Sequence, residues 1–200
     1  MTKKHILGDF EKALLFGLIF SILISFANFN NDCETLRKNV LRLHIIANSD
    51  SKSDQEIKLK VRDAILSESG ELFKNSDGLS ASKRLAKNNL KSFENTANNV
   101  IKHKGYTAKA KIGKSYFNTR DYDTFSLPAG EYDSLIITLG EGKGHNWWCV
   151  IYPSVCIGGS RAKLKDSAGK SSAIAENPKK YKVKFKIVEI YENLKRKRKR

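Results

Sequence analysis

The spacing of hydrophobic residues changes along the chain. After one alternating stretch at residues 40–47, it follows a helical period to about residue 103 and a period of two beyond that. Residues 40–47 (VLRLHIIA) alternate apolar and polar side chains, which predicts a first strand. Ser53-Asp54-Gln55-Glu56 then fits a capping box, and the apolar residues after it predict a helix to about Ser69. A second helix with one apolar face is predicted over residues 82–103, ending before Gly105.

Beyond Gly105 the pattern favours strands. They are predicted over residues 106–112, 116–125, 132–139 and 147–152, with a turn at 127–130 and a glycine-rich hairpin turn at 140–146. Residues 160–178 are polar and predict a long loop, whereas residues 181–190 (YKVKFKIVEI) predict a lysine-faced edge strand. Helices followed by strands indicate one α+β domain, with two N-terminal helices packed on a mainly antiparallel sheet.

The N-terminus has the three parts of an export signal. Lys3, Lys4 and Lys12 form a basic start, a 14-residue apolar run covers residues 13–26, and small residues predict cleavage after Ala27. The run is shorter than the roughly 18–20 residues of a comfortable membrane span, and an uncleaved anchor is the alternative. The predicted organisation is therefore a signal at 1–27, a lead-in at 28–39, a domain at 40–192 and a basic tail at 193–200.

The chain carries a net charge of +16, concentrated near its C-terminus. Residues 179–200 hold eleven Lys or Arg against two Glu. In an exported protein, this charge favours an anionic membrane face or cell wall as the counter-surface, and no nucleic acid is expected. The tail is expected to be disordered, either attracted to anionic lipid or solvated without a dedicated role.

The three cysteines make a disulfide between Cys149 and Cys156 feasible outside the cytoplasm, with Cys33 left over. His145 lies four residues before Cys149, so a thiol nucleophile with a histidine base is conceivable, but a buried thiol or a disulfide is the preferred interpretation. His44 and the other histidines lack ligands at metal spacing, and we expect neither a metal nor a cofactor.

Trp147 and Trp148 are adjacent on a predicted strand, so their side chains must point to opposite faces. One is expected in the core and the other on the opposite face, exposed or covered by another layer. A tryptophan beside a glycine-rich loop is a reasonable anchor for a protein partner. The predicted partner-binding residues are therefore His145, Asn146, Trp147 and Trp148, with Cys149 and Cys156 as structural support.

Two stretches of the sequence resemble the stage II sporulation protein R family. The first is LRLHIIANSDS at 41–51, running on through Asp54-Gln55 and KLKVRDA at 58–64. The second is LPAGEY at 127–132, with further matches to 140 and then GKGHNWWCV at 142–150, Pro153 and Cys156. The export segment matches as well, and residues 183–189 are similar to the family's late strand.

The resemblance implies a developmental signal of endospore-forming bacteria. Such proteins are made in the forespore and exported into the space between the two membranes. There they activate a membrane-embedded aspartic protease that cleaves the precursor of the mother-cell sigma factor E. We therefore expect a secreted or tethered, non-enzymatic activating ligand.

Two alternatives remain open from the residues alone. One is an exported cell-wall hydrolase or thiol enzyme, using Cys149 or a carboxylate such as Glu131 or Asp133. The other is a basic module that binds cell wall or lipid, whose affinity would fall steeply with salt.

Overall fold

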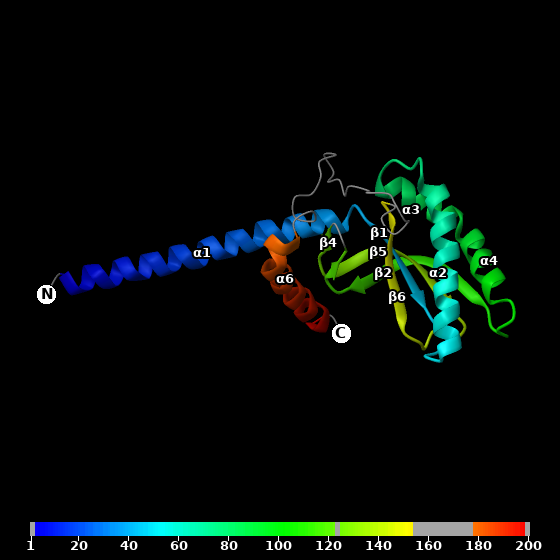
Figure 1. Cartoon of the computed structure of the whole chain (residues 1–200). Coiled ribbons are helices and arrows are strands. Elements are labelled where there is room, and N and C mark those ends of the chain that lie inside the picture. Colours follow the sequence, from blue (N-terminus) through cyan, green and yellow to red (C-terminus); the bar gives the residue numbers. More distant parts are fainter. Residues whose placement is uncertain (1–2, 123–124, 154–177, 199–200) are drawn as a thin grey trace.

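The computed structural model describes residues 3–122, 125–153 and 178–198, and Figure 1 shows their arrangement. The chain order is α1 (Lys3–Arg37), β1 (Leu41–Ile46), α2 (Lys52–Phe73), α3 (Gly78–Asn88), α4 (Leu90–Ile101), β2 (Ala108–Phe117), β3 (Arg120–Asp121), β4 (Ser126–Leu127), β5 (Gly130–Leu139), β6 (Asn146–Tyr152) and α6 (Pro178–Arg198). The predicted α+β class and its single domain are confirmed.

A four-stranded sheet in the order β2-β5-β1-β6 forms the centre of the molecule. Strand β1 pairs with β5 in parallel and with β6 antiparallel, and β2 pairs antiparallel with β5, so the sheet is mainly antiparallel as predicted. Since β5 and β6 both pair with β1 and not with each other, residues 140–145 cross the end of β1. The predicted hairpin turn at 140–146 is therefore wrong.

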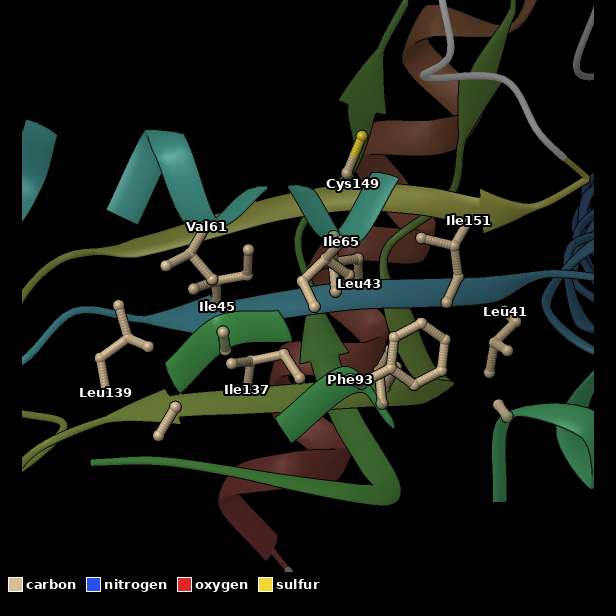
Figure 2. Packing of buried hydrophobic residues seen from close by; sticks show 14 of the residues in the cluster. Leu41, Leu43, Ile45, Val61, Ile65, Phe93, Ile137, Leu139, Cys149 and Ile151 are labelled. Atoms are coloured by element: carbon tan, nitrogen blue, oxygen red, sulfur yellow. The ribbon is translucent and has the colours of Figure 1, made fainter. Parts of the chain in front are cut away.

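Helices α2, α3 and α4 cover one face of the sheet (Figure 1). Apolar side chains from all four sheet strands meet the helices there, and Figure 2 shows most of them. Strand β1 contributes Leu41, Leu43 and Ile45, all fully buried. Val61 and Ile65 of α2 are also fully buried, so the predicted four-residue spacing does mark the core side of that helix.

The helix boundaries differ from the predicted ones where local hydrogen bonds decide them. Helix α2 is capped by Ser51, whose Oγ accepts a hydrogen bond from the Asp54 backbone N–H at 3.1 Å, so the predicted capping box at Ser53 is wrong. The predicted helix over 82–103 is two helices that meet at Asn89. The Asn89 side chain donates to the Leu85 carbonyl oxygen at 2.8 Å and so helps to end α3.

The other face of the sheet is covered by the last turns of α1 and by α6 (Figure 1). Phe29, Cys33 and Leu36 of α1 are buried, so the predicted lead-in is helical and contributes to the core. They pack with Phe185 and Val188 of α6 and with apolar residues of the sheet.

The segment predicted as the last strand is helical, and that prediction is wrong. Tyr181, Phe185, Val188 and Glu192 follow a helical spacing and turn toward α1 and the sheet, whereas Val183 and Ile187 are exposed. As a helix, the segment buries Phe185 and Val188 against α1, where the Phe29 and Phe185 ring centroids lie 5.4 Å apart. Because α6 runs to Arg198, the expectation of a disordered tail is also corrected.

The described residues of the predicted strand at 116–125 do not form one strand. Strand β2 continues to Phe117, and β3 and β4 then form a separate two-stranded pair. The loop predicted at 160–178 lies, up to residue 177, outside the described residues.

Helix α1 is a single rod whose first half projects from the domain (Figure 1). Its large apolar residues from Phe10 to Ile24 are exposed. The stretch Gly8–Arg37 is long and apolar enough to cross a membrane by length and composition, a test that signal sequences also pass. Ala27 is exposed on this helix, between the projecting half and the buried half.

Because only the C-terminal end of α1 is buried, alanine substitutions of two leucines in this helix should have very different effects on stability. Leu36→Ala should lower the free energy of unfolding by about 2–4 kcal/mol, because Leu36 is 2% exposed and its truncation leaves a cavity. Leu14→Ala, at a position 59% exposed, should change it by less than about 0.5 kcal/mol. Urea unfolding of the full chain in mild detergent, followed by circular dichroism, measures both. Equal effects would contradict a core role for the end of α1.

Candidate functional site

Two loops meet at the C-terminal end of β1 and form one surface, which we call the loop pair: residues 47–51 and residues 140–146. Their backbones are bonded directly. The Gly144 N–H donates to the Ala47 carbonyl oxygen at 2.9 Å, and the Lys143 N–H donates to the Asn48 carbonyl oxygen at 3.1 Å. The two sequence stretches that carry the family resemblance thus come together in space.

The glycines of the second loop are explained by this packing. Gly140 and Gly142 have positive φ values of 53° and 63°, which side-chain-bearing residues rarely adopt. A Cβ on Gly144 would overlap the backbone carbonyl of Ser49. The glycine-rich segment is therefore a close-fitting cover over the 47–51 loop, not a phosphate cradle.

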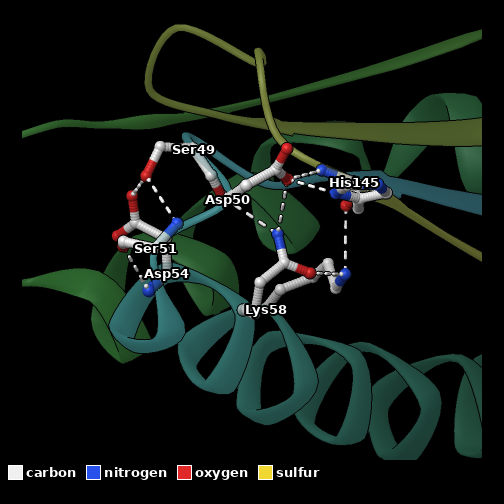
Figure 3. A network of polar contacts seen from close by, with 7 residues as sticks. Ser49, Asp50, Ser51, Asp54, Lys58 and His145 are labelled. Atoms are coloured by element: carbon white, nitrogen blue, oxygen red, sulfur yellow. Dashed lines mark hydrogen bonds and ion pairs between the residues drawn. The ribbon is translucent and has the colours of Figure 1, made fainter.

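Asp54, in the first turn of α2, holds the loop pair together from below (Figure 3). Its carboxylate accepts hydrogen bonds from Ser49 Oγ (2.6 Å), from Asn48 Nδ2 (2.9 Å) and from the Tyr106 hydroxyl (2.9 Å). Asn48 in turn accepts from the Glu141 N–H at 2.9 Å, so it links the carboxylate to the glycine loop. The hydrogen bonds from Ser49 and Asn48 lower the pKa of Asp54 to about 2.

The exposed part of the loop pair is a contact between Asp50 and His145. The Asp50 carboxylate accepts from the His145 backbone N–H, and its Oδ1 lies 2.5 Å from the imidazole Nδ1. The backbone hydrogen bond is the main reason why the pKa of Asp50 is lowered. Both side chains are exposed, and the imidazole is thus presented to solvent in a fixed orientation.

Two residues of α2 hold this contact from behind (Figure 3). Lys58, which is 5% exposed, donates to the His145 carbonyl oxygen at 3.0 Å and to Gln55 Oε1. Gln55 donates to the Ser49 carbonyl oxygen at 2.9 Å. The loop pair is therefore a polar surface whose backbone is fixed by hydrogen bonds from α2.

The four predicted partner-binding residues lie on three different surfaces. His145 belongs to the exposed top of the loop pair. Trp147 lies on the helix face, half-buried, with the Arg62 guanidinium 4.6 Å above its ring. Trp148 points to the opposite face, as strand alternation predicts, and stacks on His44 with ring centroids 3.8 Å apart. Asn146 is exposed and lines a cavity beside Trp148.

The structure does not place the candidate catalytic residues of a thiol enzyme or hydrolase together. Cys149 is disulfide-bonded and 5% exposed, so it is no nucleophile in this state; Cys156 lies outside the described residues. Asp133 is ion-paired with Lys83 at 2.8 Å, and Glu131 lies at the start of β5, far along the strand from the loop pair. Within the described ranges, no group of three His, Cys, Asp or Glu side chains is placed to hold a metal ion.

Sequence reasoning missed Asp50, Asp54 and Arg42. The sequence marks Asp54 only as part of a capping box and gives Asp50 no role, because nothing local indicates that residues 140–146 fold over them. Arg42 was placed on a polar strand face, but it is fully buried. The one available signal was the family resemblance, which includes all three positions.

The fold defines a mixed α+β protein with an apolar N-terminal helix and a polar loop pair at the end of β1. Comparison with known proteins identifies the family: the chain belongs to the stage II sporulation protein R (spore_II_R) family, whose model matches residues 37–162. It is 35% identical over 119 residues to Stage II sporulation protein R of Bacillus subtilis (strain 168), an alignment that covers 58% of this chain and 53% of that relative. The chain thus spans about half the length of this relative. No solved structure matches it.

Close packing at Gly144 predicts a destabilising effect of a single methyl group. Gly144→Ala should lower the free energy of unfolding by about 1–3 kcal/mol, since the Ser49 carbonyl must shift to admit the Cβ. Gly17→Ala is the matched control, because a Cβ there meets nothing within 4 Å. Chemical denaturation of both variants measures the difference, and a silent Gly144→Ala would contradict the described contact between the loops.

The lowered pKa of Asp54 predicts a specific pH dependence. A carboxylate with a folded pKa of about 2, against an ordinary value of 3.8, stabilises the fold above pH 3.8 and loses that contribution as the pH falls toward 2. The contribution is about 1–2 kcal/mol at neutral pH.

The test compares wild type with Asp54→Ala at several pH values by urea unfolding. The stability gap should be largest near pH 7 and should narrow below pH 4. Asp63→Ala, at a side chain 64% exposed, should show a small gap throughout. A gap for Asp54→Ala that stayed constant down to pH 2 would contradict the assignment.

Proposed function

We propose that this protein is an exported sporulation signal that acts as a non-enzymatic activating ligand. Its receptor in this proposal is a membrane-embedded aspartic protease, which then cleaves the precursor of the mother-cell sigma factor E. Family membership supports a role in sporulation. The observation that carries the proposal is the loop pair, in which the two family-like stretches form one rigid, exposed polar surface.

The N-terminal helix supports the proposed location. The sporulation family and the apolar half of α1 fit a secreted or membrane-tethered protein. The compartment we propose is the space between the forespore and mother-cell membranes. There, the exposed lysines and arginines of α6 would meet anionic membrane surfaces, and nucleic acid is not a proposed partner.

A binding role, as opposed to catalysis, is supported by the arrangement around His145. Its Nδ1 faces Asp50, and the adjoining hydrogen bonds fix the loop backbone rather than a substrate. The sulfur nearest in sequence, at Cys149, is bonded in a disulfide. Among the described residues, the hydrogen-bond partners of His145 are the Asp50 carboxylate and the Lys58 ammonium group.

An activating ligand shifts its receptor only by binding the active form more tightly than the inactive one. A rigid surface suits that task, because little conformational entropy is lost when it binds. In this proposal His145 and Asp50 contact the outer part of the protease, with Asn146 and the two tryptophans beside or beneath them.

The proposal predicts an outcome in a non-sporulating host that co-expresses the protein, the protease and the sigma precursor. Wild type should cause cleavage of the precursor. His145→Ala and Asp50→Ala should reduce cleavage at least about fivefold, the effect of an interface residue worth more than about 1 kcal/mol. Immunoblotting of precursor and product measures the ratio.

Lys87→Ala, an exposed substitution on α3 away from the loop pair, is the control and should leave cleavage unchanged. Circular dichroism of each purified variant separates lost contact from lost folding. An uncleaved precursor with wild type would refute the activating role. Full cleavage with both loop variants would refute the proposed contact surface while leaving the activating role intact.

A further inference from the structure

A second site lies on the sheet face opposite α2, where a cavity of about 450 Å³ opens beside Trp148. Its lining includes three arginines, two asparagines and one tryptophan: Arg42, Arg120, Arg196, Asn118, Asn146 and Trp148. No Asp or Glu is among the described residues that line it. The cavity therefore gathers positive charge without a neutralising partner.

Arg42 is the unusual member of this set, because it is fully buried. Its Nε donates to the Cys149 carbonyl oxygen at 2.9 Å and its Nη2 to the Tyr122 hydroxyl at 3.1 Å. Phe117 lies against the guanidinium, with its ring centroid 4.0 Å from Cζ. Its remaining nitrogen, Nη1, is buried and has no hydrogen-bond partner among the described residues.

Such an arrangement is costly in free energy. Burial opposes the charged form and lowers the pKa of Arg42 from its ordinary value. A buried charge without a counter-ion is usually strongly destabilising, and buried polar groups are nearly always hydrogen-bonded. An oxyanion bound in the cavity would supply both the missing charge and an acceptor.

A neighbouring cavity of about 340 Å³ provides an internal contrast. It also contains a buried arginine, Arg37, but there Glu34 and Glu192 lie 3.1 and 3.6 Å from its Nη2. The charge of the buried Arg37 is thus balanced by two carboxylates of the chain itself, those of Glu34 and Glu192. Among the described residues that line the second cavity, the chain supplies none around Arg42.

The remaining walls suit a small planar or tetrahedral anion. Trp148 offers a flat apolar surface held by its stack on His44. The amide groups of Asn118 and Asn146 can donate hydrogen bonds. Arg196 of α6 is held 4.3 Å above the Tyr116 ring, which keeps its charge at the edge of the cavity.

We propose that the Arg42 cavity binds an oxyanion, namely a single carboxylate or phosphate group. Arg42 forms the floor of the site and Arg120 and Arg196 its rim. The proposal goes beyond the activating role. Asn146 and Trp148 belong to both proposed sites, but anion binding to the purified protein can be measured directly, without the receptor, so the two proposals can fail separately.

The test uses the full chain carrying Trp147→Phe, which leaves Trp148 as the single tryptophan. Its emission is followed while acetate or inorganic phosphate replaces chloride at constant ionic strength. We expect a saturable change with at least one of the two anions. Arg120→Gln and Arg196→Gln should each weaken binding about fivefold, the effect of removing one partly exposed charge.

Arg84→Gln, an exposed arginine on α3, is the matched control and should leave the titration unchanged. Binding of acetate alone identifies a carboxylate site, and tighter binding of phosphate identifies a phosphate site. The proposal is overturned if neither anion differs from chloride, or if both rim variants bind as wild type does. Arg42→Lys adds a direct test of the floor, and the rim variants decide the question if that variant does not fold.

Discussion

The position of β1 at the centre of the sheet determines much of the rest of the structure. Because β1 pairs with β5 on one side and with β6 on the other, the chain between β5 and β6 must pass over the end of β1. That crossing brings residues 140–146 onto residues 47–51. The glycines, the Asp54 network and the exposed contact between Asp50 and His145 all follow from this single constraint of strand order.

A central strand also has to be covered on both faces, and this explains the two layers. Helices α2 to α4 cover one face, and the other is covered by the end of α1 together with α6. The apolar N-terminal segment and the domain therefore share one helix. The predicted cleavage after Ala27 would remove the exposed apolar half but leave Phe29, Cys33 and Leu36 in the core, so the fold is compatible with either a cleaved or a retained N-terminal segment.

Local sequence patterns predicted the elements that have one clearly apolar side. They failed where contacts with distant parts of the chain determine the secondary structure. The α2 spacing and the alternation of Trp147 and Trp148 were sufficient because each element has one clearly apolar side. Residues 181–190 alternate as a strand would, yet Tyr181, Phe185 and Val188 also fit a helix, and only packing on α1 decides between the two periods. Likewise, Arg42 and His44 are the polar positions of the β1 alternation, yet both are buried, because the second layer is formed by segments distant in sequence.

The same topology separates the proposed contact surface from the N-terminal helix. Helix α1 ends just before β1 begins, and the loop pair follows the last residue of β1. Six residues of strand span about 20 Å, so the loop pair lies that far from the point where α1 joins the sheet. The cavity at Arg42 lies between these two ends, beside α6. In the proposed membrane-tethered form, with the apolar half of α1 in the membrane, His145 would thus lie on a part of the domain that the proposed receptor could reach without contacting the anchor.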